Sequence, residues 1–204
     1  MPEFKTEQEK FWAGEFGKNY INRNTDYLGN IPLFSKIFSK TNNVTSIIEL
    51  GANIGLNLKA IKTVLPNTDL SAVEISSDAV KELEQIEDLN VYNESLLDFN
   101  VDYKRDFVLI KGVLIHINPD FLDEVYDLLY NLTDKYICIA EYYNPTPVGV
   151  NYRGHEDKLF KRDFAGEVLD KFDDLELVDY GFVYHRDNNF PQDDITWFLL
   201  KKTR

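Results

Sequence analysis

The sequence predicts a doubly wound α/β fold, in which a mainly parallel sheet carries helices on both faces. Three observations predict it. Short apolar runs alternate with amphipathic segments through most of the chain, which is typical of parallel strands joined by crossover helices. The first of these runs ends in a glycine-containing turn, Gly51 to Gly55. The last two runs are separated only by a polar turn, so the sheet should end in an antiparallel hairpin.

The N-terminal region is expected to be helical. Aromatic residues recur at three-to-four spacing between Glu7 and Tyr27, which indicates an amphipathic helix. This stripe either packs over the sheet as a cap or closes over a ligand as a lid, turning at Gly14 to Gly17 and using Tyr20 and Arg23. A second, shorter helix is expected at Ile31–Phe38, because a proline stands in its first turn.

The remaining elements follow in the order that a doubly wound sheet requires. Each predicted strand is a short apolar run, and each predicted helix has apolar residues at helical spacing. A proline ends the first of these helices. We expect strands at Ser46–Leu50, Asp69–Ile75, Asn90–Asn93, Phe107–Lys111, Tyr136–Glu141, Leu175–Tyr184 and Ile195–Lys201, and helices at Leu56–Leu65, Asp78–Glu87 and Pro119–Leu132.

Length and composition fit one packed domain. The chain has 204 residues, of which 44% are hydrophobic and 14% aromatic, enough to bury a sizeable core. Within it we distinguish a helical cap over residues 1–40 and a sheet-bearing part over residues 41–204. A net charge of -13 repels polyanions and anionic bilayers, so neither nucleic acid nor a membrane is expected as a partner. The N-terminus lacks a secretion signal, which favours a cytoplasmic location.

Disulfide and metal chemistry are not expected. The single cysteine, Cys138, cannot form an internal disulfide and lies in an apolar run, so we interpret it as part of the core. The three histidines, His116, His155 and His185, are far apart and lack paired metal-ligand spacing. No metal site is therefore predicted.

One acid precedes the first turn and another ends the next strand. Glu49 stands just before Gly51-Ala52-Asn53-Ile54-Gly55, and Glu74 follows about 20 residues further on, where a doubly wound sheet places a carboxylate under a ribose. An acid that ends a strand can also be a solvated edge residue, but its distance from the turn favours ribose binding. We therefore expect Glu49, Gly51, Asn53 and Gly55 to surround a nucleoside, because glycine lets the backbone approach a ligand closely.

The glycine pattern separates the kinds of nucleoside ligand. A dinucleotide site needs three spaced glycines beside a pyrophosphate, and a Walker loop needs Gly-Lys-Ser/Thr, neither of which this turn has. A nicotinamide oxidoreductase is therefore disfavoured. With Glu49 in front of it, the turn resembles the first motif of the class I S-adenosylmethionine-dependent methyltransferases. The resemblance implies a Rossmann-like class I methyltransferase fold, S-adenosylmethionine as cofactor and S-adenosylhomocysteine as product.

The same resemblance implies roles for residues after the later strands. Ser95 takes the position from which a polar or acidic side chain reaches the adenine amino group, while Leu96 and Ile75 would cover the two faces of the ring. The backbone of Lys111 and Gly112 would pass the methionine moiety. In the same segment His116 is either a structural loop residue or a group near the acceptor.

Residues 141–164 are expected to form a long loop on the ligand side of the sheet, where long loops commonly carry function. Basic residues outnumber acidic ones between positions 153 and 162, which indicates either a solvated charged turn or a site for a carboxylate or phosphate, with Arg153 as a bidentate donor. The candidates for a base or for hydrogen bonds to the acceptor are His116, Tyr152 and His155. The predicted acceptor contacts are Tyr142, Asn144, Arg153, Lys161 and Arg162.

Several segments spread over the whole chain resemble the pseudaminic acid biosynthesis-associated methylases. That family implies methylation of a small anionic sugar or nucleotide sugar on the way to nonulosonic acids of bacterial surface glycans. Two other hypotheses remain: methylation of another small-molecule, phenolic or protein acceptor, and a non-catalytic nucleoside-binding scaffold in a glycan pathway. The segments that carry the resemblance are Phe11-Trp12 to Arg23-Asn24, Glu141–Pro145, Tyr152–His155, Leu159–Phe164 and Asp193–Phe198.

Overall fold

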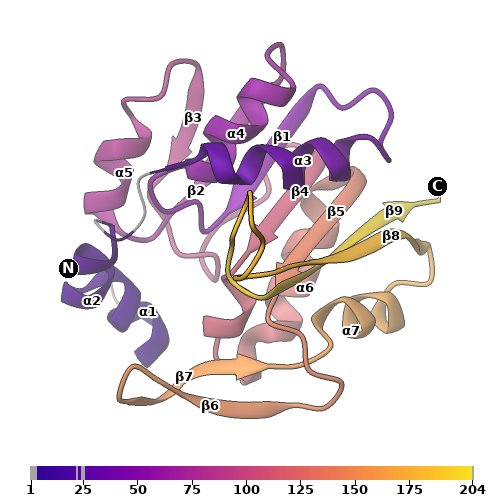
Figure 1. Ribbon diagram of the computed structural model, residues 1–204. Helices are drawn as coiled ribbons and strands as arrows, with labels where there is room; N and C mark the ends of the chain where they lie inside the picture. Colours follow the sequence, from indigo (N-terminus) through magenta and orange to yellow (C-terminus); the bar gives the residue numbers. More distant parts are fainter. Residues whose placement is uncertain (1–3, 22, 24–25, 204) are drawn as a thin grey trace.

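The computed structural model, which describes residues 4–21, 23 and 26–203, has a seven-stranded sheet at its centre (Figure 1). Its strands are β1 Ser46–Leu50, β2 Asp69–Val73, β3 Leu89–Tyr92, β4 Arg105–Lys111, β5 Thr133–Glu141, β8 Leu175–Val183 and β9 Ile195–Lys202. They lie in the order β3-β2-β1-β4-β5-β9-β8. The first five run parallel, and β9 pairs antiparallel with both β5 and β8. The predicted fold, a mainly parallel sheet that ends in an antiparallel hairpin, is confirmed.

This strand order creates a switch point between β1 and β4. The chain winds outward from β1 through β2 to β3 and then returns to the other side of β1 to form β4. The crossover connections on the two sides of this point leave in opposite directions, and a crevice opens at the carboxyl ends of the strands. In this protein Leu50 and Lys111 end the two strands that flank the switch point.

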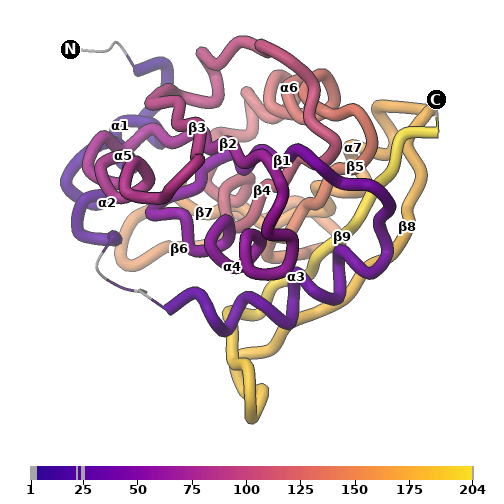
Figure 2. The backbone as a smooth tube through the Cα atoms, turned by 90° about the horizontal axis from the view of Figure 1, so that it is seen from above, coloured from indigo at the N-terminus to yellow at the C-terminus, as the bar shows by residue number. Residues whose placement is uncertain are grey.

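Helices cover both faces of the sheet (Figure 2). Along β1 the side chains alternate, so that Ile47 packs with the helices α3 Ile31–Phe38, α4 Leu56–Val64 and α5 Ser77–Leu83. Ile48 packs on the opposite face with α6 Leu122–Leu132 and α7 Phe164–Lys171. Both residues are fully buried, as expected for a parallel strand enclosed on both sides. None of the described helices is long and apolar enough to cross a bilayer.

The segment predicted to be helical from Glu7 to Tyr27 is helical only as far as Tyr20, and it is divided within the turn expected at Gly14 to Gly17. The structure has two short helices, α1 Glu7–Ala13 and α2 Glu15–Tyr20, divided at Gly14, where the backbone is extended. A close approach between them requires a second glycine, because a Cβ atom on Gly17 would lie 1.8 Å from the carbonyl oxygen of Trp12. Residues 22, 24 and 25 of the predicted helix lie outside the described residues.

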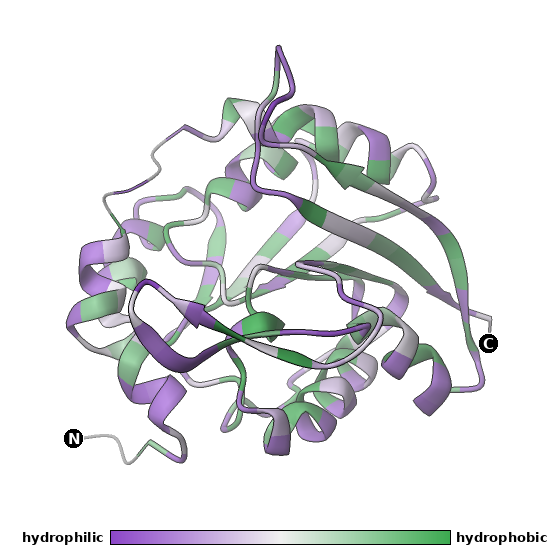
Figure 3. Cartoon of the chain, turned by 60° about the horizontal axis from the view of Figure 1, so that its bottom comes forward, coloured by the Kyte–Doolittle hydropathy of each residue, from purple (hydrophilic) through white to green (hydrophobic). Residues whose placement is uncertain are grey.

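The loop predicted over residues 141–164 is also wrong in part, because it contains a β-hairpin. Strands β6 Val148–Tyr152 and β7 His155–Lys161 pair antiparallel across a two-residue turn. Arg153 and Gly154 in this turn have φ values of 54° and 85°, the combination that joins twisted strands without splaying them. Figure 3 shows the hairpin crossing in front of the sheet, with its turn next to the N-terminal helices.

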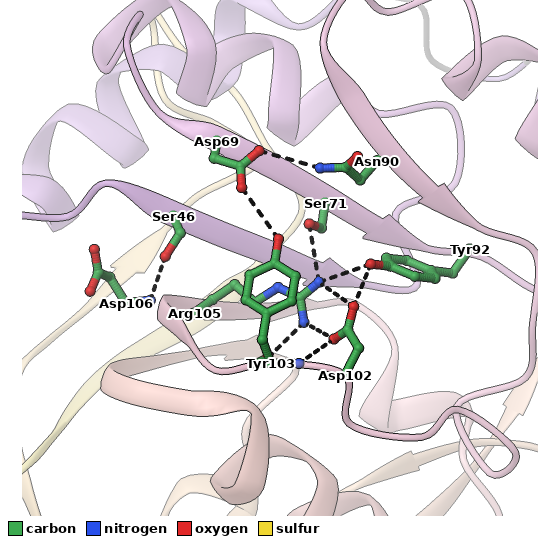
Figure 4. A network of polar contacts seen from close by, with 9 residues as sticks. All are labelled: Ser46, Asp69, Ser71, Asn90, Tyr92, Asp102, Tyr103, Arg105 and Asp106. Atoms are coloured by element: carbon green, nitrogen blue, oxygen red, sulfur yellow. Dashed lines mark hydrogen bonds and ion pairs between the residues drawn. The ribbon is translucent and has the colours of Figure 1, made fainter.

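A buried arginine at the start of β4 joins side chains of β2 and β3 (Figure 4). Arg105, the first residue of β4, is fully buried. It forms an ion pair with Asp102 and donates hydrogen bonds to Ser71 at 3.3 Å and to the hydroxyl of Tyr92 at 3.1 Å. Its guanidinium also lies 3.5 Å from the centre of the Tyr103 ring. Because this network sits at the start of β4, we interpret it as structural rather than as part of a ligand site.

Candidate functional site

A cavity of about 740 Å³ lies at the carboxyl ends of the central strands, within the range of about 300 to 1,000 Å³ that small-molecule sites have. The turn after β1 and the ends of β2 and β4 form its floor, and the N-terminal helices, β6 and the β8–β9 turn contribute to its walls. Ten of the twelve predicted cofactor residues line it: Tyr20, Arg23, Gly51, Asn53, Glu74, Ile75, Ser95, Leu96, Lys111 and Gly112. The other two, Glu49 and Gly55, lie behind this lining.

The turn after β1 has a backbone that favours glycine. Gly51, Asn53 and Gly55 have φ values of 73°, 49° and 77°, in the left-handed region that glycine adopts at no cost and that asparagine tolerates better than most residues. Space is limited as well, because a Cβ atom on Gly51 would lie 2.5 Å from a methyl carbon of Val113. The turn therefore holds its backbone directly against the cavity.

The carboxylate of Glu74 joins this turn to the end of β2. One of its oxygens accepts a hydrogen bond from the backbone N–H of Asn53 at 2.8 Å, and the other accepts one from the N–H of Ser76 at 2.8 Å. The side chain is buried at the cavity wall, and this burial raises its pKa against the lowering effect of those hydrogen bonds. Each carboxylate oxygen has a second acceptor site, so Glu74 is able to accept further hydrogen bonds from a ligand.

Three ionisable groups lie close together at the same floor: the buried acids Glu49 and Glu141, and Lys111, which lines the cavity. Glu49 is fully buried and accepts a hydrogen bond from Asn57 at 2.6 Å, while its second oxygen has no partner among the described residues. Burial raises the pKa of Glu49 to about 8 and that of Glu141 to about 7. Burial lowers the pKa of the Lys111 ammonium, although Glu49, Asp193 and Glu141 all act to raise it. The floor is therefore a cluster whose charges depend on one another.

At the β3 side of the cavity the structure shows a residue that the sequence did not predict for the site. The hydroxyl of Ser95 donates a hydrogen bond to the carboxylate of Glu9, which belongs to α1. Glu9 is 7% exposed and lines the cavity. The spacing of Thr6 and Glu9 is visible in the sequence as a capping box, but that pattern predicts where a helix begins and not what it faces.

His116 also lines the cavity, where it lies between two aromatic rings. Its ring centre is 4.6 Å from that of Trp12 and 5.0 Å from that of Tyr152. Nδ1 lies 2.6 Å from the carbonyl oxygen of Lys158, and since a carbonyl only accepts, Nδ1 carries the proton and Nε2 is left as an acceptor. Burial lowers the pKa of His116 to about 4, so the ring is neutral at physiological pH.

The C-terminal turn also reaches the cavity, which the sequence did not predict. Gln192 donates a hydrogen bond to the carbonyl oxygen of Gly29 at 2.8 Å and thereby ties the β8–β9 turn to the N-terminal region. Its neighbour Asp193 accepts a hydrogen bond from the hydroxyl of Tyr142. Burial is the main cause that raises the pKa of Tyr142, which keeps this hydroxyl protonated. Gln192, Asp193 and Tyr142 all line the cavity.

The residues predicted for acceptor contact are only partly brought together. Tyr142, Tyr152 and His116 line the cavity, whereas the side chains of five others lie outside its lining. Two of these five are cations beside lining rings: the Arg153 guanidinium lies 5.4 Å from the centre of the Tyr152 ring, and the Lys161 ammonium lies 5.0 Å from that of Tyr142. The other three are Arg162, which pairs with Glu167 at 2.9 Å, Asn144, which donates to Thr146, and His155, which packs against Phe11 and Phe16.

Solved S-adenosylmethionine-dependent methyltransferases have a fold similar to that of this chain. The chain is similar to Burkholderia thailandensis 1,6-didemethyltoxoflavin-N1-methyltransferase with bound 1,6-didemethyltoxoflavin and S-adenosylhomocysteine, with a TM-score of 0.71 and 16% identity over 100% of this chain and 94% of that one. It is also similar to the plantazolicin methyltransferase BpumL in complex with S-adenosylhomocysteine, with a TM-score of 0.68 and 16% identity over 97% and 94% of the two chains.

A third similar structure is an S-adenosylmethionine-dependent methyltransferase from Clostridium acetobutylicum, with a TM-score of 0.63 and 12% identity over 92% of this chain and 98% of that one. No protein-family model matches the sequence, and no curated protein matches it either. At these identities the likeness establishes the fold, so the activity of this chain has to be argued from its own cavity.

The steric limit at Gly51 leads to a testable prediction. Gly51→Ala should lower the free energy of unfolding by about 2 to 4 kcal/mol, because a left-handed backbone and a collision with Val113 add together. Gly112→Ala is the matched control: its φ is 68° but nothing lies within 4 Å of the added carbon, so only the backbone cost of about 1 kcal/mol applies. Urea unfolding of both variants measures the difference.

If the collision is the cause, Val113→Ala should recover part of the stability that Gly51→Ala loses. Equal losses in Gly51→Ala and Gly112→Ala, or no recovery in the double variant, would show that the turn is not tightly packed.

Proposed function

We propose that this protein is an S-adenosylmethionine-dependent methyltransferase. The observation that carries the proposal is the pairing of the turn Gly51 to Gly55 with the buried carboxylate of Glu74 beside a cavity of about 740 Å³. The acceptor we propose is a small anionic sugar or nucleotide sugar in nonulosonic (pseudaminic) acid biosynthesis. This second part is supported by the resemblance to the pseudaminic acid biosynthesis-associated methylases and by the cations beside the cavity.

The residues present fit the proposed cofactor. A side chain at Gly51 would collide with Val113, so the turn supplies a surface of bare backbone against which a ligand can lie. Glu74 offers acceptors for the two hydroxyls of a ribose, and Ile75 and Leu96 are apolar walls on either side of the place where an adenine would follow. Arg23 lies 5.1 Å from the ring of Tyr20 at the cavity lining and is the cation we assign to a methionine carboxylate.

The chemistry places few demands on the protein beyond positioning. When bound, S-adenosylmethionine supplies a methyl group on a sulfonium sulfur, and the transfer forms a bond from the acceptor heteroatom to that carbon while the carbon–sulfur bond breaks. The protein must hold the acceptor in line and exclude competing nucleophiles. The rings of Trp12, Tyr142 and Tyr152 and the backbone of Lys111 and Gly112 border the space in which this alignment would occur.

The environment of the cavity supports an anionic acceptor. The protein carries a net charge of -13, yet Arg153 and Lys161 stand next to two rings of the cavity wall without an ion pair among the described residues. We leave Arg162 out of the proposed acceptor site, because Glu167 neutralises its charge. Two cations at the entrance to an acidic protein would attract a carboxylate or phosphate and disfavour cationic acceptors.

His116 is the residue we assign as general base for a hydroxyl acceptor. The hydrogen bond from Nδ1 to the carbonyl oxygen of Lys158 fixes the tautomer, so that Nε2 is the acceptor. Its pKa of about 4 keeps it unprotonated in the resting enzyme, and a proton that leaves the acceptor would pass to Nε2. Tyr152 packs against this ring and is placed to orient the acceptor.

The cofactor assignment is tested by calorimetry with S-adenosylhomocysteine. We expect binding to the wild-type protein, weakened by about 1 to 3 kcal/mol in Glu74→Gln, because one buried charged acceptor is lost. Glu84→Gln, which changes an exposed acid on the neighbouring helix, should bind as the wild type does. Absence of binding to folded wild-type protein would overturn the proposed function, and an unchanged affinity in Glu74→Gln would remove Glu74 from the site.

The acceptor assignment is tested by offering nonulosonic acids and their nucleotide-activated forms together with S-adenosylmethionine. Mass spectrometry should detect the added methyl group. The double variant Arg153→Gln/Lys161→Gln should raise KM for the acceptor about tenfold, which corresponds to about 1.4 kcal/mol, without changing kcat. Lys81→Gln/Lys104→Gln, an equal change of net charge at exposed positions, is the control. If the protein instead methylates a phenolic or peptide acceptor, and neither double variant changes the kinetics of that reaction, the sugar proposal would be replaced. If the protein binds the cofactor but methylates none of these acceptors, a non-catalytic nucleoside-binding scaffold would be favoured.

The role of His116 is tested by the pH dependence of kcat. The folded pKa lies below the ordinary value, so the wild-type base is already unprotonated at neutral pH, and kcat should fall only as the pH drops through about 4. In His116→Asn we expect kcat to be about 10² to 10⁴ times lower and to rise with pH from 6 to 9 as hydroxide replaces the base. A variant with wild-type rate and a flat profile would exclude His116 as the base.

A further inference from the structure

We propose that Glu9, which is carried by the N-terminal helix α1, recognises the exocyclic amino group of the cofactor's adenine, and that cofactor binding thereby holds α1 closed over the cavity. This inference rests on the proposed function, because it names a recognition residue and a moving part for that same site.

The first support is the position of Glu9. Its side chain is 7% exposed and lines the cavity together with Ser95, Leu96 and Ile75. These three residues follow the ends of β3 and β2, so they lie on the side of the cavity beyond Glu74. If Glu74 holds the ribose, the base attached to that ribose lies along this wall. Glu94 on the same wall is exposed, so the carboxylate of Glu9 is then the buried acidic group next to the base.

The second support is how the carboxylate is held. One oxygen accepts a hydrogen bond from the backbone N–H of Thr6 at 2.7 Å and a second from the Thr6 hydroxyl at 3.2 Å. The other oxygen accepts one from the hydroxyl of Ser95. A carboxylate oxygen accepts two hydrogen bonds, so this second oxygen retains one acceptor site. A fixed acceptor with one open site matches an amino group, which donates, and it disfavours a carbonyl oxygen at the same position of the base.

The third support is that α1 is anchored around the cavity and not in the core of the sheet. Its two buried residues are Gln8 and Glu9, both polar, and a helix of seven residues is not stable by itself. Its rings belong to neither core cluster of the sheet: Phe11 packs on Phe16 and His155, and Trp12 packs on His116. Gln8 donates to the carbonyl oxygen of Asp157 at 2.9 Å, and Lys5, just before the helix, donates to that of Leu97 at 2.6 Å. A ligand that fills the cavity would therefore add to the contacts that hold α1 in place.

The experiment compares binding of S-adenosylhomocysteine with that of S-inosylhomocysteine, which has a carbonyl oxygen in place of the amino group. We expect the wild type to prefer the amino compound by at least about 30-fold, since a site built for a donor rejects an analogue that lacks it. In Glu9→Gln, whose amide both donates and accepts, this preference should fall to about threefold. Glu7→Gln is the matched control, because Glu7 lies on the same helix with its side chain 72% exposed, and its preference should equal that of the wild type.

Closure of α1 has its own readout in amide hydrogen exchange. In the wild type, S-adenosylhomocysteine should slow the exchange of residues 7–13 by at least about tenfold, and S-inosylhomocysteine at saturating concentration should slow it less. Should Glu9→Gln fail to fold, as judged by circular dichroism, Ser95→Ala takes its place: it removes the hydroxyl that fixes the carboxylate and should lower the preference in the same direction.

The outcomes separate the two proposals. If S-adenosylhomocysteine does not bind to folded wild-type protein, the proposed function itself fails. If it binds, but both Glu9→Gln and Ser95→Ala keep the wild-type preference, Glu9 is not the adenine-recognition residue. If the preference falls but residues 7–13 exchange at the same rate with and without ligand, recognition stands and closure of α1 is overturned.

Discussion

The site depends on one hydrogen bond between the segments that follow β1 and β2, from the N–H of Asn53 to the carboxylate of Glu74, at 2.8 Å. It holds the turn after β1 in a left-handed backbone conformation that a chain of ordinary residues would avoid. The N–H of Gly51 adds a second tie to β2, through the carbonyl oxygen of Val73 at 2.8 Å. Because the turn is fixed at both of these points, its backbone stays open toward the cavity and the helix α4 begins directly behind it, with Gly55 as its N-cap.

Near that turn, the floor of the cavity concentrates ionisable groups that are largely shielded from solvent. Burial raises the pKa values of two carboxyls, Glu49 and Glu141, toward neutrality. Burial also lowers the pKa of the Lys111 ammonium. Hydrogen bonds from Asn57 to Glu49 and from the backbone N–H groups of Val113 and Leu114 to Glu141 favour the charged carboxylates. Lys111 interacts with both carboxylates, so removing one of the three groups changes the protonation of the others. The charge of the floor is therefore set by the cluster as a whole, and a cationic ligand above it would favour the ionised carboxyls.

Much of this architecture was predictable from local sequence, and the parts that were not have a common physical reason. The succession of strands and helices along the chain and the C-terminal hairpin depend on patterns only a few residues long, which act wherever they occur. The contact between Glu9 and Ser95 spans 86 residues, and no local pattern encodes which helix will meet which loop. The hairpin β6–β7 was missed because prolines and glycines around it indicate a loop, although Arg153-Gly154 is itself a suitable hairpin turn.

The acceptor side of the cavity differs in kind from the cofactor side. The sheet is shared, at 16% identity, with solved methyltransferases that hold acceptors as different as 1,6-didemethyltoxoflavin and desmethylplantazolicin analogues, so strands and turns alone do not decide what is methylated. In this chain the segments that we propose to select the acceptor meet only in the folded protein: α1 with Trp12, η2 Leu114–His116, and the hairpin with Tyr152.

If Glu9 holds α1 in place through the cofactor, Trp12, one helical turn further along, reaches its position against His116 only after the cofactor has bound. The part of the cavity proposed for the acceptor would then be complete only after the cofactor has bound. The cofactor would therefore bind before the acceptor. A site assembled in this order keeps the reactive methyl group covered until an acceptor enters, which is the condition that methyl transfer in water requires.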